Sequence, residues 1–433
     1  MRNSSTGMPK STGNSSMPDL FLGIDIGTSG ARAIVIDADE VVRAEASSPM
    51  AEHGTNHRAP QVWWAAASSA TEVALAMVDP RQVRALAIDG TSGTMLSLDA
   101  SGAPLGDGLM YNDACADAAI LDRIAAVAPA DSAARGSSSA LARAIRLAAS
   151  GAVRVVHQAD WIAWHFSGRV ASDENNALKT GYDLGTCAWP DWIGATGFDV
   201  TLLPDVVAPG TPIGPVTPEA ARAFGLSPQT LVVAGTTDGC ASFVATGANA
   251  AGDGVTALGT TMTLKLLSDR EISAPEYGIY SHRILSHWLA GGASNTGGGV
   301  LLAHFDPEAL AELSSRIDPE TDSPYDYYPL AAPGERFPIA DPTMEPRLDP
   351  RPDEPEDFLK GMLDGIARIE ALAYARLAEL GAPRLRTVRT VGGGASNPAW
   401  TRLRARRLDV PMPTPASVEA AYGSAVLACL GAR

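Results

Sequence analysis

The sequence predicts an α/β fold in which two domains face each other across a cleft. The chain has 433 residues, which is long for one ordinary domain and suits two domains of about 200 residues each. Two similar hairpins, each with a glycine turn between two strands, occur around Gly27 and Gly259. A strand before Asp238 runs into a polar turn and then a helix, which is where open α/β sheets bind ligands.

The composition argues against several classes of partner. The chain is 45% hydrophobic and 19% charged, so it can build full cores. Its formal net charge of −16 is spread along the chain, which argues against a nucleic-acid partner because nucleic-acid binding needs a basic face. No apolar run approaches the length of a membrane span, so we expect no membrane partner.

The cysteines indicate the compartment. The chain has 4 of them, Cys115, Cys187, Cys240 and Cys429, far apart in the sequence and without a CxxC pair. This spacing favours a reduced, cytoplasmic protein with buried thiols over a disulfide or zinc framework. We expect a monomer or a homodimer.

The domain limits follow from composition and from a proline-rich connector. Residues 1–17 are rich in Ser, Asn, Thr, Gly and Met, so we expect a disordered leader that does not belong to the fold. Residues 204–218 hold several prolines and glycines and predict an extended connector. The first domain is therefore expected at residues 18–228 and the second at residues 229–433.

The first hairpin carries a candidate phosphate site. Strands are expected at residues 19–26, 31–37 and 41–46. In the turn at residues 27–30, the amides and the Thr28 and Ser29 hydroxyls can hold phosphate oxygens. Asp25 faces the same place, where a carboxylate can hold Mg²⁺ directly or through water. The alternative is an ordinary hairpin with a tight glycine turn.

Two further polar turns follow in the first domain. A helix is expected at residues 60–78, and strands are expected at residues 83–89 and 95–99. Asp89 ends the first of these strands. Asn112 and Asp113 close an apolar run and are expected to open a helix. They either cap that helix or bind sugar hydroxyls, which need both donors and acceptors.

The rest of the first domain is predicted to be largely helical. Residues 114–150 indicate two helices broken near Pro129 and Gly136, and residues 153–166 indicate a helical element with aromatic packing. We interpret His157 as structural. The polar stretch at residues 172–183 either lines the cleft or forms a solvated loop. Its candidate cleft residues are Asp173, Lys179 and Asp183.

Asp238 stands between the strand at residues 231–234 and a helix that begins near Cys240. A carboxylate at such a turn, backed by a helix N-terminus, can accept a proton from a bound hydroxyl. The alternative is that Asp238 caps the helix, because Asp is a preferred capping residue.

The second half repeats the pattern of the first. Residues 254–267 predict a hairpin around Gly259, Thr260 and Thr261. A strand from His287 enters a glycine-rich loop and a helix near Gly298. Two hairpins of one kind indicate two related domains that share a cleft.

The C-terminal part of the second half is predicted to contain mainly helices. Residues 318–355 are dense in Pro, Asp and Arg and are expected to form a surface hairpin or a lid. A long helix at residues 355–380 and a strand at residues 387–391 follow. A glycine-rich loop at residues 392–397, against which an adenine ring can slide, comes before helices that begin at Pro398 and Ala420.

Five motifs occur along the chain in one order. They are Asp25-Ile-Gly-Thr-Ser-Gly30, Tyr111-Asn-Asp113, Gly235-Thr-Thr-Asp-Gly-Cys240, Leu258-Gly-Thr-Thr261 and Gly392-Gly-Gly-Ala-Ser-Asn-Pro398. In this order they resemble the motifs of FGGY-type carbohydrate kinases, and the resemblance covers residues 19–431. It implies two ribonuclease H-like domains of the actin/hexokinase type with a cleft between them. It also implies MgATP-dependent phosphorylation of a sugar or polyol hydroxyl.

The resemblance also implies the role of each site residue. Asp238 matches the general base that takes the proton of the attacking hydroxyl. Asp25 matches the acidic residue near Mg²⁺ and the γ-phosphate. The implied nucleotide-binding residues are Asp25, Thr28, Ser29, Arg32, Gly259, Thr260, Thr261, Gly298, Gly393, Gly394, Ala395 and Asn397. The implied substrate-binding residues are Asp89, Asn112, Asp113 and Asp238, and the implied cofactors are ATP and Mg²⁺.

Two departures from the family pattern bear on the sugar. Xylulose kinases usually carry Gln-Met-His-Gly where this chain has Asp89-Gly-Thr-Ser-Gly-Thr-Met95, and the chain is shorter than most members. Both features resemble the compact D-ribulose kinase branch. D-ribulose is therefore the favoured substrate, followed by D-xylulose or another polyol. Asp89 either contacts the sugar or only caps its turn.

Two other classes of function are weighed against a sugar kinase. An actin-like ATPase shares the phosphate hairpins but uses water as the acceptor, and the Asn112-Asp113 pair and the Asp238 turn argue against it. A non-catalytic sugar sensor is expected to have lost Asp238 or the Gly259 turn, and both are present.

Overall fold

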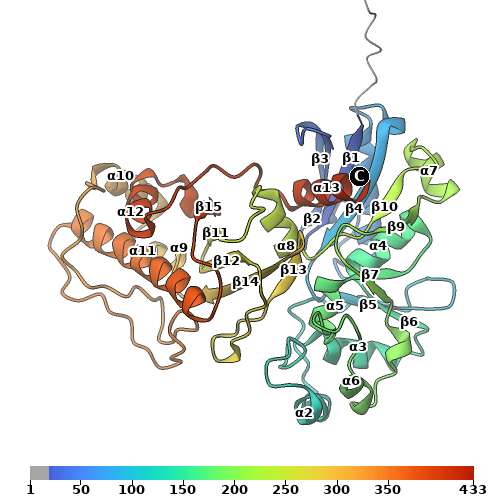
Figure 1. The fold of residues 1–433 in the computed structure, drawn as a ribbon, viewed down its shortest axis with the longest axis horizontal. Coiled ribbons are helices and arrows are strands. Elements are labelled where there is room, and N and C mark those ends of the chain that lie inside the picture. Colours follow the sequence, from blue (N-terminus) through green and yellow to red (C-terminus); the bar gives the residue numbers. More distant parts are fainter. Residues whose placement is uncertain (1–18) are drawn as a thin grey trace, which may run out of the picture.

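The computed structural model describes residues 19–433, so the leader expected at residues 1–17 lies outside the described range. Two β-sheets, each covered by helices, form the two halves of the molecule (Figure 1). Within residues 19–433, no helix combines the length and the apolar character needed to cross a membrane.

The first sheet has six strands in the order β3-β2-β1-β4-β10-β9. They are β1 (Leu20–Ile26), β2 (Gly30–Asp37), β3 (Val42–Pro49), β4 (Val83–Gly90), β9 (Pro212–Pro215) and β10 (Leu231–Val233). β1 pairs antiparallel with β2 and parallel with β4, and β4 pairs parallel with β10. The carboxyl ends of β1, β4 and β10 therefore meet at one edge of the sheet.

The second sheet has five strands in the order β13-β14-β12-β11-β15. They are β11 (Asp253–Leu258), β12 (Met262–Ser268), β13 (His282–Ile284), β14 (His287–Ser294) and β15 (Thr387–Val391). β11 pairs antiparallel with β12 and parallel with β15, as β1 pairs with β2 and β4. The two glycine hairpins therefore hold equivalent places in two related sheets.

The remaining elements include two small sheets and thirteen α-helices within residues 19–433. The small sheets pair β5 (Met95–Leu98) with β6 (Arg154–His157) and β7 (Ala171–Asp173) with β8 (Asp205–Val207). The first eight helices are α1 (Pro60–Leu75), α2 (Ala118–Val127), α3 (Ala140–Ala148), α4 (Gln158–Ser167), α5 (Glu174–Thr180), α6 (Asp191–Ala195), α7 (Pro218–Phe224) and α8 (Asp238–Ala245). The others are α9 (Gly298–Leu302), α10 (Pro307–Arg316), α11 (Pro355–Glu379), α12 (Pro398–Leu408) and α13 (Ala420–Gly431).

Several predicted elements need correction. β10 completes the first sheet instead of opening the second half, so the expected boundary at residue 228 falls before a strand of the first sheet. Asn112 and Asp113 lie in a turn and do not open a helix, because α2 begins only at Ala118. The stretch at residues 172–183 is not a solvated loop, since β7 and α5 bury most of it.

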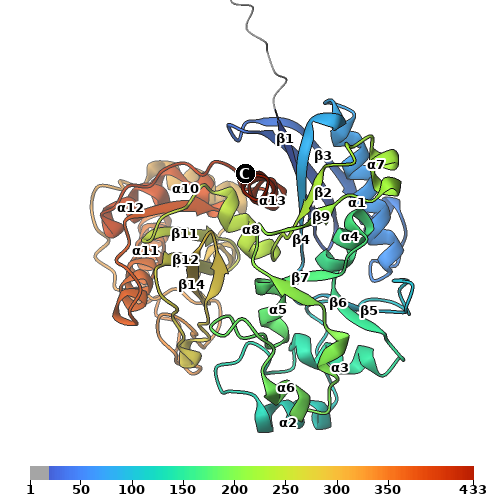
Figure 2. The ribbon, with the colours of Figure 1, turned by 45° about the vertical axis from the view of Figure 1, so that its right-hand side comes forward.

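The C-terminal helix α13 returns to the first sheet and lies beside β1, β4 and α8 (Figures 1 and 2). Glycines permit this close approach. A Cβ atom at Gly23 of β1 would lie 1.9 Å from the Ala421 carbonyl oxygen, and one at Gly423 would lie 1.9 Å from the Ala241 carbonyl oxygen of α8. Both carbonyl oxygens belong to the backbone, so no movement of a side chain could make room for a Cβ atom at either glycine.

Alternation along β1 divides its side chains between two cores. Leu22 and Ile24 pack in the cluster that contains α1, whereas Phe21 packs with α8 and α13 in another cluster. That second cluster also contains Val255 and Leu267 of the second sheet. One apolar core therefore joins the two halves of the molecule.

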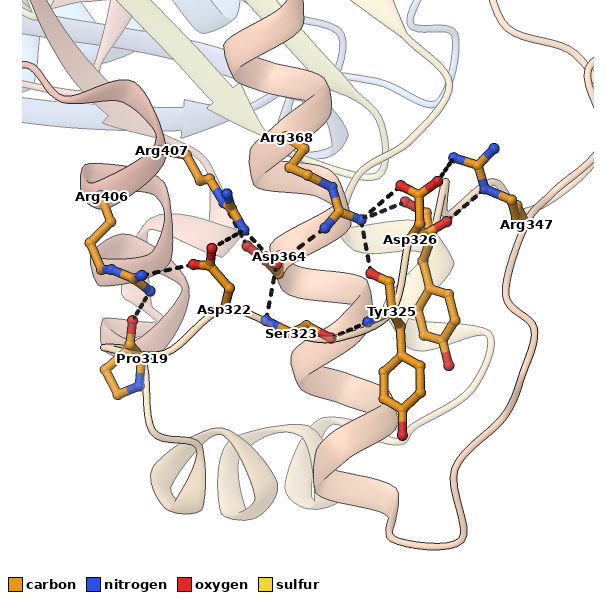
Figure 3. A network of polar contacts seen from close by, with 11 residues as sticks. Pro319, Asp322, Ser323, Tyr325, Asp326, Arg347, Asp364, Arg368, Arg406 and Arg407 are labelled. Atoms are coloured by element: carbon orange, nitrogen blue, oxygen red, sulfur yellow. Dashed lines mark hydrogen bonds and ion pairs between the residues drawn. The ribbon is translucent and has the colours of Figure 1, made fainter.

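The segment at residues 318–355 is irregular but is held against α11 and α12 (Figure 3). Asp364 of α11 is fully buried and accepts hydrogen bonds from Arg407 at 2.9 and 3.0 Å and from the Ser323 amide at 3.3 Å. Tyr327 and Phe337 are buried in the core of the second half. The middle of this segment is thus part of a packed core, which does not fit a free lid.

A fully buried ion pair joins α11 to α12. Arg404 donates from Nε and Nη2 to Glu370 at 2.5 and 2.7 Å, and Thr256 of β11 donates to the same carboxylate at 2.5 Å. Removing one partner of such a pair leaves an uncompensated charge in the core.

We predict that Arg404→Met lowers the free energy of unfolding by about 3–5 kcal/mol, because the Glu370 charge would lose its buried partner. Arg402→Met is the matched control on the same helix, because the ion pair between Arg402 and Glu320 is exposed. Its loss should lower the free energy of unfolding by about 1 kcal/mol or less. Urea unfolding followed by tryptophan fluorescence measures both. Equal losses for the two variants would contradict this account of the core.

Candidate active site

Three aspartates converge at the edge where β1, β4 and β10 end. Asp25 and Asp89 occupy paired positions on the neighbouring parallel strands β1 and β4. Asp238 is the first residue of α8, directly after the bridge between Gly90 and Thr237. The cavity at this edge measures about 330 Å³ and is lined by Asp25 and Asp238. A separate cavity of about 710 Å³ lies away from these aspartates.

Asp238 is positioned by the start of α8. The N-cap is Thr237, so Asp238 is not the cap itself. Its Oδ1 accepts a hydrogen bond of 2.7 Å from the Gly239 amide. Burial raises the pKa of Asp238, while the Gly239 amide and the Lys265 ammonium act in the opposite direction. A carboxylate with a raised pKa beside a cavity suits a general base.

Asp89 lies behind Asp25 and is wholly buried. Its Oδ2 accepts a hydrogen bond of 2.6 Å from Ser424 of α13. Burial, followed by the neighbouring charge of Asp25, raises the pKa of Asp89 well above the ordinary value. The expected direct contact between Asp89 and the sugar does not hold in this structure, because no surface of Asp89 is exposed.

Burial also raises the pKa of Asp25, and the hydrogen bond from Asp89 opposes this change. Arg32 lies 3.6 Å from the Asp25 carboxylate and 3.3 Å from Glu419, which precedes α13. The cavity therefore holds the carboxylates of Asp25, Asp238 and Glu419 against the single guanidinium of Arg32 in its lining. Such a site favours ligands that bring positive charge with them.

Residues of both glycine turns line cavities. Thr28 and Ser29 line the carboxylate cavity and are exposed. Gly259, Thr260 and Thr261 are exposed in the equivalent turn of the second sheet. The Gly298 amide donates to the Gly259 carbonyl at 2.8 Å, so the N-terminus of α9 supports that turn. Exposed turn amides and hydroxyls are suited to phosphate oxygens.

A larger cavity of about 790 Å³ adjoins the second turn. Its walls combine the Gly259–Thr260 turn, the start of α9, the face of α10 and the loop before α12. Of the predicted nucleotide-binding residues, this lining contains Gly259, Thr260, Gly298, Gly393, Gly394 and Asn397. A mostly apolar cavity with a phosphate-type turn at one end has the features of a nucleotide site.

The Asn112-Asp113 pair lies beside the carboxylate cavity without lining it, whereas the preceding Tyr111 does line it. Asp113 accepts hydrogen bonds from Arg58 at 2.6 Å and from the Met110 amide at 2.7 Å. The Arg58 guanidinium lowers the pKa of Asp113. Asn112 is exposed. The role of the pair toward a sugar stays a prediction.

Asn175 of α5 joins the two halves next to the Asp238 turn. Its fully buried side chain donates to Thr236 at 2.9 Å and to the Arg283 carbonyl at 2.8 Å. It also accepts a hydrogen bond of 2.9 Å from the Arg283 amide on β13. One side chain thus fixes the strand β13 of the second half to the turn that carries Asp238.

Sequence reasoning missed several residues around the cavity. The additional lining residues are Thr91, Tyr111, Ser242, Val418, Glu419 and Ala420. Glu419 and Ala420 are distant in sequence and reach the site only because α13 folds back. Lys265 on β12 donates to the Gly239 carbonyl, but it alternates with the buried Leu264 and Leu266, so the strand pattern alone predicts that it faces solvent.

Comparison with known proteins bears on this arrangement. The N-terminal domain of the FGGY family of carbohydrate kinases matches residues 20–128 and 142–245, and the C-terminal domain matches residues 247–432. The chain belongs to the FGGY family of carbohydrate kinases. The break between the matches follows α8, which agrees with the place of β10 in the first sheet.

Relatives named xylulose kinase share low identity with this chain. The one from Escherichia coli is 24% identical over 452 residues, which cover 96% of this chain and 90% of the relative. The one from Klebsiella pneumoniae is 26% identical over 288 residues, which cover 62% of this chain and 59% of that relative. The second match therefore spans less than two thirds of that relative's length.

Solved structures confirm the predicted fold. A xylulose kinase from Rhodospirillum rubrum is similar with a TM-score of 0.80 and 22% identity, covering 94% of this chain and 89% of that chain. A "xyloylose kinase" from Brucella ovis is similar with a TM-score of 0.80 and 21% identity, and the match covers 95% of this chain and 90% of that chain. The prediction of two ribonuclease H-like domains of the actin/hexokinase type is therefore confirmed.

We predict that Asn175→Ala lowers kcat/KM for sugar-dependent ADP release by about tenfold or more, because it removes the hydrogen bond to Thr236 in the Asp238 turn and the two to the Arg283 backbone on β13. Asn176→Ala is the control, since Asn176 is similarly buried but its side chain donates to Asp173 of the same segment and not to the Asp238 turn. Coupled ADP assays compare the two. A similar change in both variants would show that Asn175 has no special role in positioning.

Proposed function

We propose that the protein transfers the γ-phosphoryl group of ATP to a hydroxyl of a ketopentose, with D-ribulose as the favoured acceptor and D-ribulose 5-phosphate as the product. The observation that carries this proposal is the place of Asp238. It lies at the start of a helix and lines a cavity that residues of the first phosphate-type turn also line. Membership of a carbohydrate kinase family supports the same reaction.

In this proposal the nucleotide lies in the larger cavity. Its adenosine packs against Gly393, Gly394, Ala395 and Asn397, and its phosphates reach the turn at residues 259–261. The turn at residues 27–30 contacts the γ-phosphate from the other half. Phosphoryl transfer depends mainly on positioning and charge stabilisation, which amide-rich turns supply.

The residues present fit a magnesium ion. Mg²⁺ usually keeps several waters and takes one or two carboxylates together with phosphate oxygens. No group of three or more His, Cys, Asp or Glu side chains that could hold a metal converges within residues 19–433, so the protein's own share would be small. Asp25, which lines the acidic cavity beside the first turn, would be that ligand directly or through water. The ion would supply charge neutralisation at the phosphates.

Asp238 acts as the general base. Its carboxylate accepts the proton of the attacking sugar hydroxyl while the sugar oxygen bonds to the γ-phosphorus. The bond from that phosphorus to the bridging oxygen breaks, and ADP leaves. Closure of the two halves would exclude water, which otherwise competes as the acceptor.

The choice of sugar rests on the turn after β4. This chain has Asp89-Gly-Thr-Ser-Gly-Thr-Met95 where xylulose kinases usually have Gln-Met-His-Gly. That difference favours D-ribulose. The relatives named xylulose kinase favour D-xylulose as the second candidate. Tyr111, Thr91 and Ser242 line the cavity and would contact either sugar, with Asn112 and Asp113 at its rim.

The buried thiols Cys115, Cys240 and Cys429 are free, which supports a cytoplasmic location as part of the proposal. The proposed partner is a small sugar, and a monomer or a homodimer is compatible with it.

We predict that ADP release with MgATP requires a ketopentose. The panel consists of D-ribulose, D-xylulose, L-ribulose, L-xylulose, glycerol and no sugar, and each is compared by kcat/KM. D-ribulose should give the highest value, because of the sequence of the turn after β4. A preference for D-xylulose would move the protein to the second candidate. Equal ADP release with and without every sugar would favour the ATPase alternative.

We predict that Asp238→Ala lowers kcat by at least about 100-fold, because general-base catalysis contributes about 10²–10⁴-fold. ATP binding, measured by calorimetry, should be largely kept. In the wild type kcat/KM should fall as the pH drops through the raised pKa of Asp238, since the base must be ionised. Asp183→Ala is the control, because Asp183 only caps the turn at residues 183–186. Near-normal turnover of Asp238→Ala would remove it from the base role.

A further inference from the structure

A second cavity lies where the two halves meet, away from the carboxylates. It measures about 710 Å³, which is within the range of about 300–1,000 Å³ typical of small-molecule sites. Its lining comes from both halves, with Glu174 and Cys187 on one side and the turn at residues 283–286 on the other. We call it the junction cavity.

The junction cavity and the active-site cavity lie at opposite ends of the same two helices. Asp238 and Ser242 of α8 line the active-site cavity, whereas Val244 of α8 and residues shortly after it line the junction cavity. On α13, Ala420 lines the first cavity and Leu430 lines the second. At Gly423, α13 packs backbone to backbone on α8, which connects the two cavities through a close-packed contact.

Glu174 is the buried polar group in the wall of the junction cavity. Only 5% of its surface is exposed. Its Oε1 lies 3.8 Å from the Arg283 guanidinium and 4.0 Å from the Cys187 thiol, which is a weak donor, whereas its Oε2 has no hydrogen-bond partner. Arg283 instead donates to the Leu184 carbonyl at 3.5 Å. A buried carboxylate whose hydrogen-bond donor is a distant thiol is costly unless a ligand supplies a stronger donor.

The charges of the lining favour a cation. Glu174 and Glu40 contribute two carboxylates, and Arg283 contributes the only guanidinium or ammonium group among the lining residues. Much of the remaining wall is apolar and includes Val426 and Leu430. A ligand that fits carries one positive hydrogen-bond donor for Glu174 and an apolar body for this wall.

Backbone strain gathers at the same place. Five non-glycine residues within residues 19–433 have positive φ, and four of them line the junction cavity. These four are Glu40, Cys187, Leu285 and Ser286. For residues with a side chain this conformation is unfavourable, and such residues are frequent at ligand clamps and switch regions.

We propose that the junction cavity is a second ligand site, which takes a small primary ammonium ion with an apolar body. Its ammonium group donates to the Glu174 carboxylate, and its apolar part packs against α13. Occupation changes the position of α8 and α13 and thereby alters turnover at Asp238. The effect on turnover rests on the proposed kinase function, whereas binding does not.

Binding is tested on the full chain by saturation-transfer NMR with benzylamine, benzyl alcohol and benzoate as probes. Benzylamine should bind, and Glu174→Gln should weaken its binding by about tenfold or more because the charged acceptor is lost. Leu430→Trp, at the partly exposed mouth, should block the probe without changing Glu174. Equal binding of benzyl alcohol and benzylamine, no binding of benzylamine, or unchanged binding in both variants would overturn the proposal.

A second measurement separates binding from coupling. Saturating benzylamine should change kcat/KM for sugar-dependent ADP release by at least about twofold in the wild type and not in Leu430→Trp. Bound benzylamine that leaves kcat/KM unchanged would overturn the coupling through α8 and α13. If no sugar supports ADP release at all, the kinase proposal fails while the binding result still stands.

Discussion

The close packing of α13 against β1 and α8 is the contact on which the active site depends. It is possible because Gly23 and Gly423 leave space for backbone that any Cβ atom would occupy. Through this contact the last helix of the chain brings Ser424 to Asp89 and places Glu419 beside Arg32. The same contact builds the apolar core that joins the two halves. The cavity around Asp238 is therefore assembled by parts of the chain that are far apart in sequence.

Electrostatics then determines how that cavity can be used. Carboxylates at close range repel one another, and burial makes each charge still less favourable. The structure reduces this cost by placing Arg32 near Asp25 and Lys265 near Asp238, and burial shifts the pKa of Asp89 upward, which favours its neutral form. The charge that remains is suited to a ligand that arrives with a divalent cation. A base with a raised pKa and an acidic neighbourhood are both consistent with phosphoryl transfer to an alcohol.

Local patterns in the sequence predicted much of the fold. The two hairpins, the turn at Asp238, the long helix α11 and the glycine loop before α12 all follow from residue periodicity and turn chemistry over a few residues. The place of β10 in the first sheet and the return of α13 could not be predicted in this way, because strand order and helix docking depend on contacts between distant segments. Asn175 was missed for the same reason, since its partners Thr236 and Arg283 belong to other elements. Asp89 was predicted to bind the sugar because the sequence of a turn does not reveal that α13 covers the side chain.

In the proposed reaction, the acceptor beside Asp238 is a sugar hydroxyl and not water. The most direct test is ³¹P NMR of the products formed from MgATP and D-ribulose by the full chain. We expect equal amounts of ADP and a sugar phosphate monoester, with little inorganic phosphate. Release of inorganic phosphate in step with ADP, without a sugar phosphate, would contradict it.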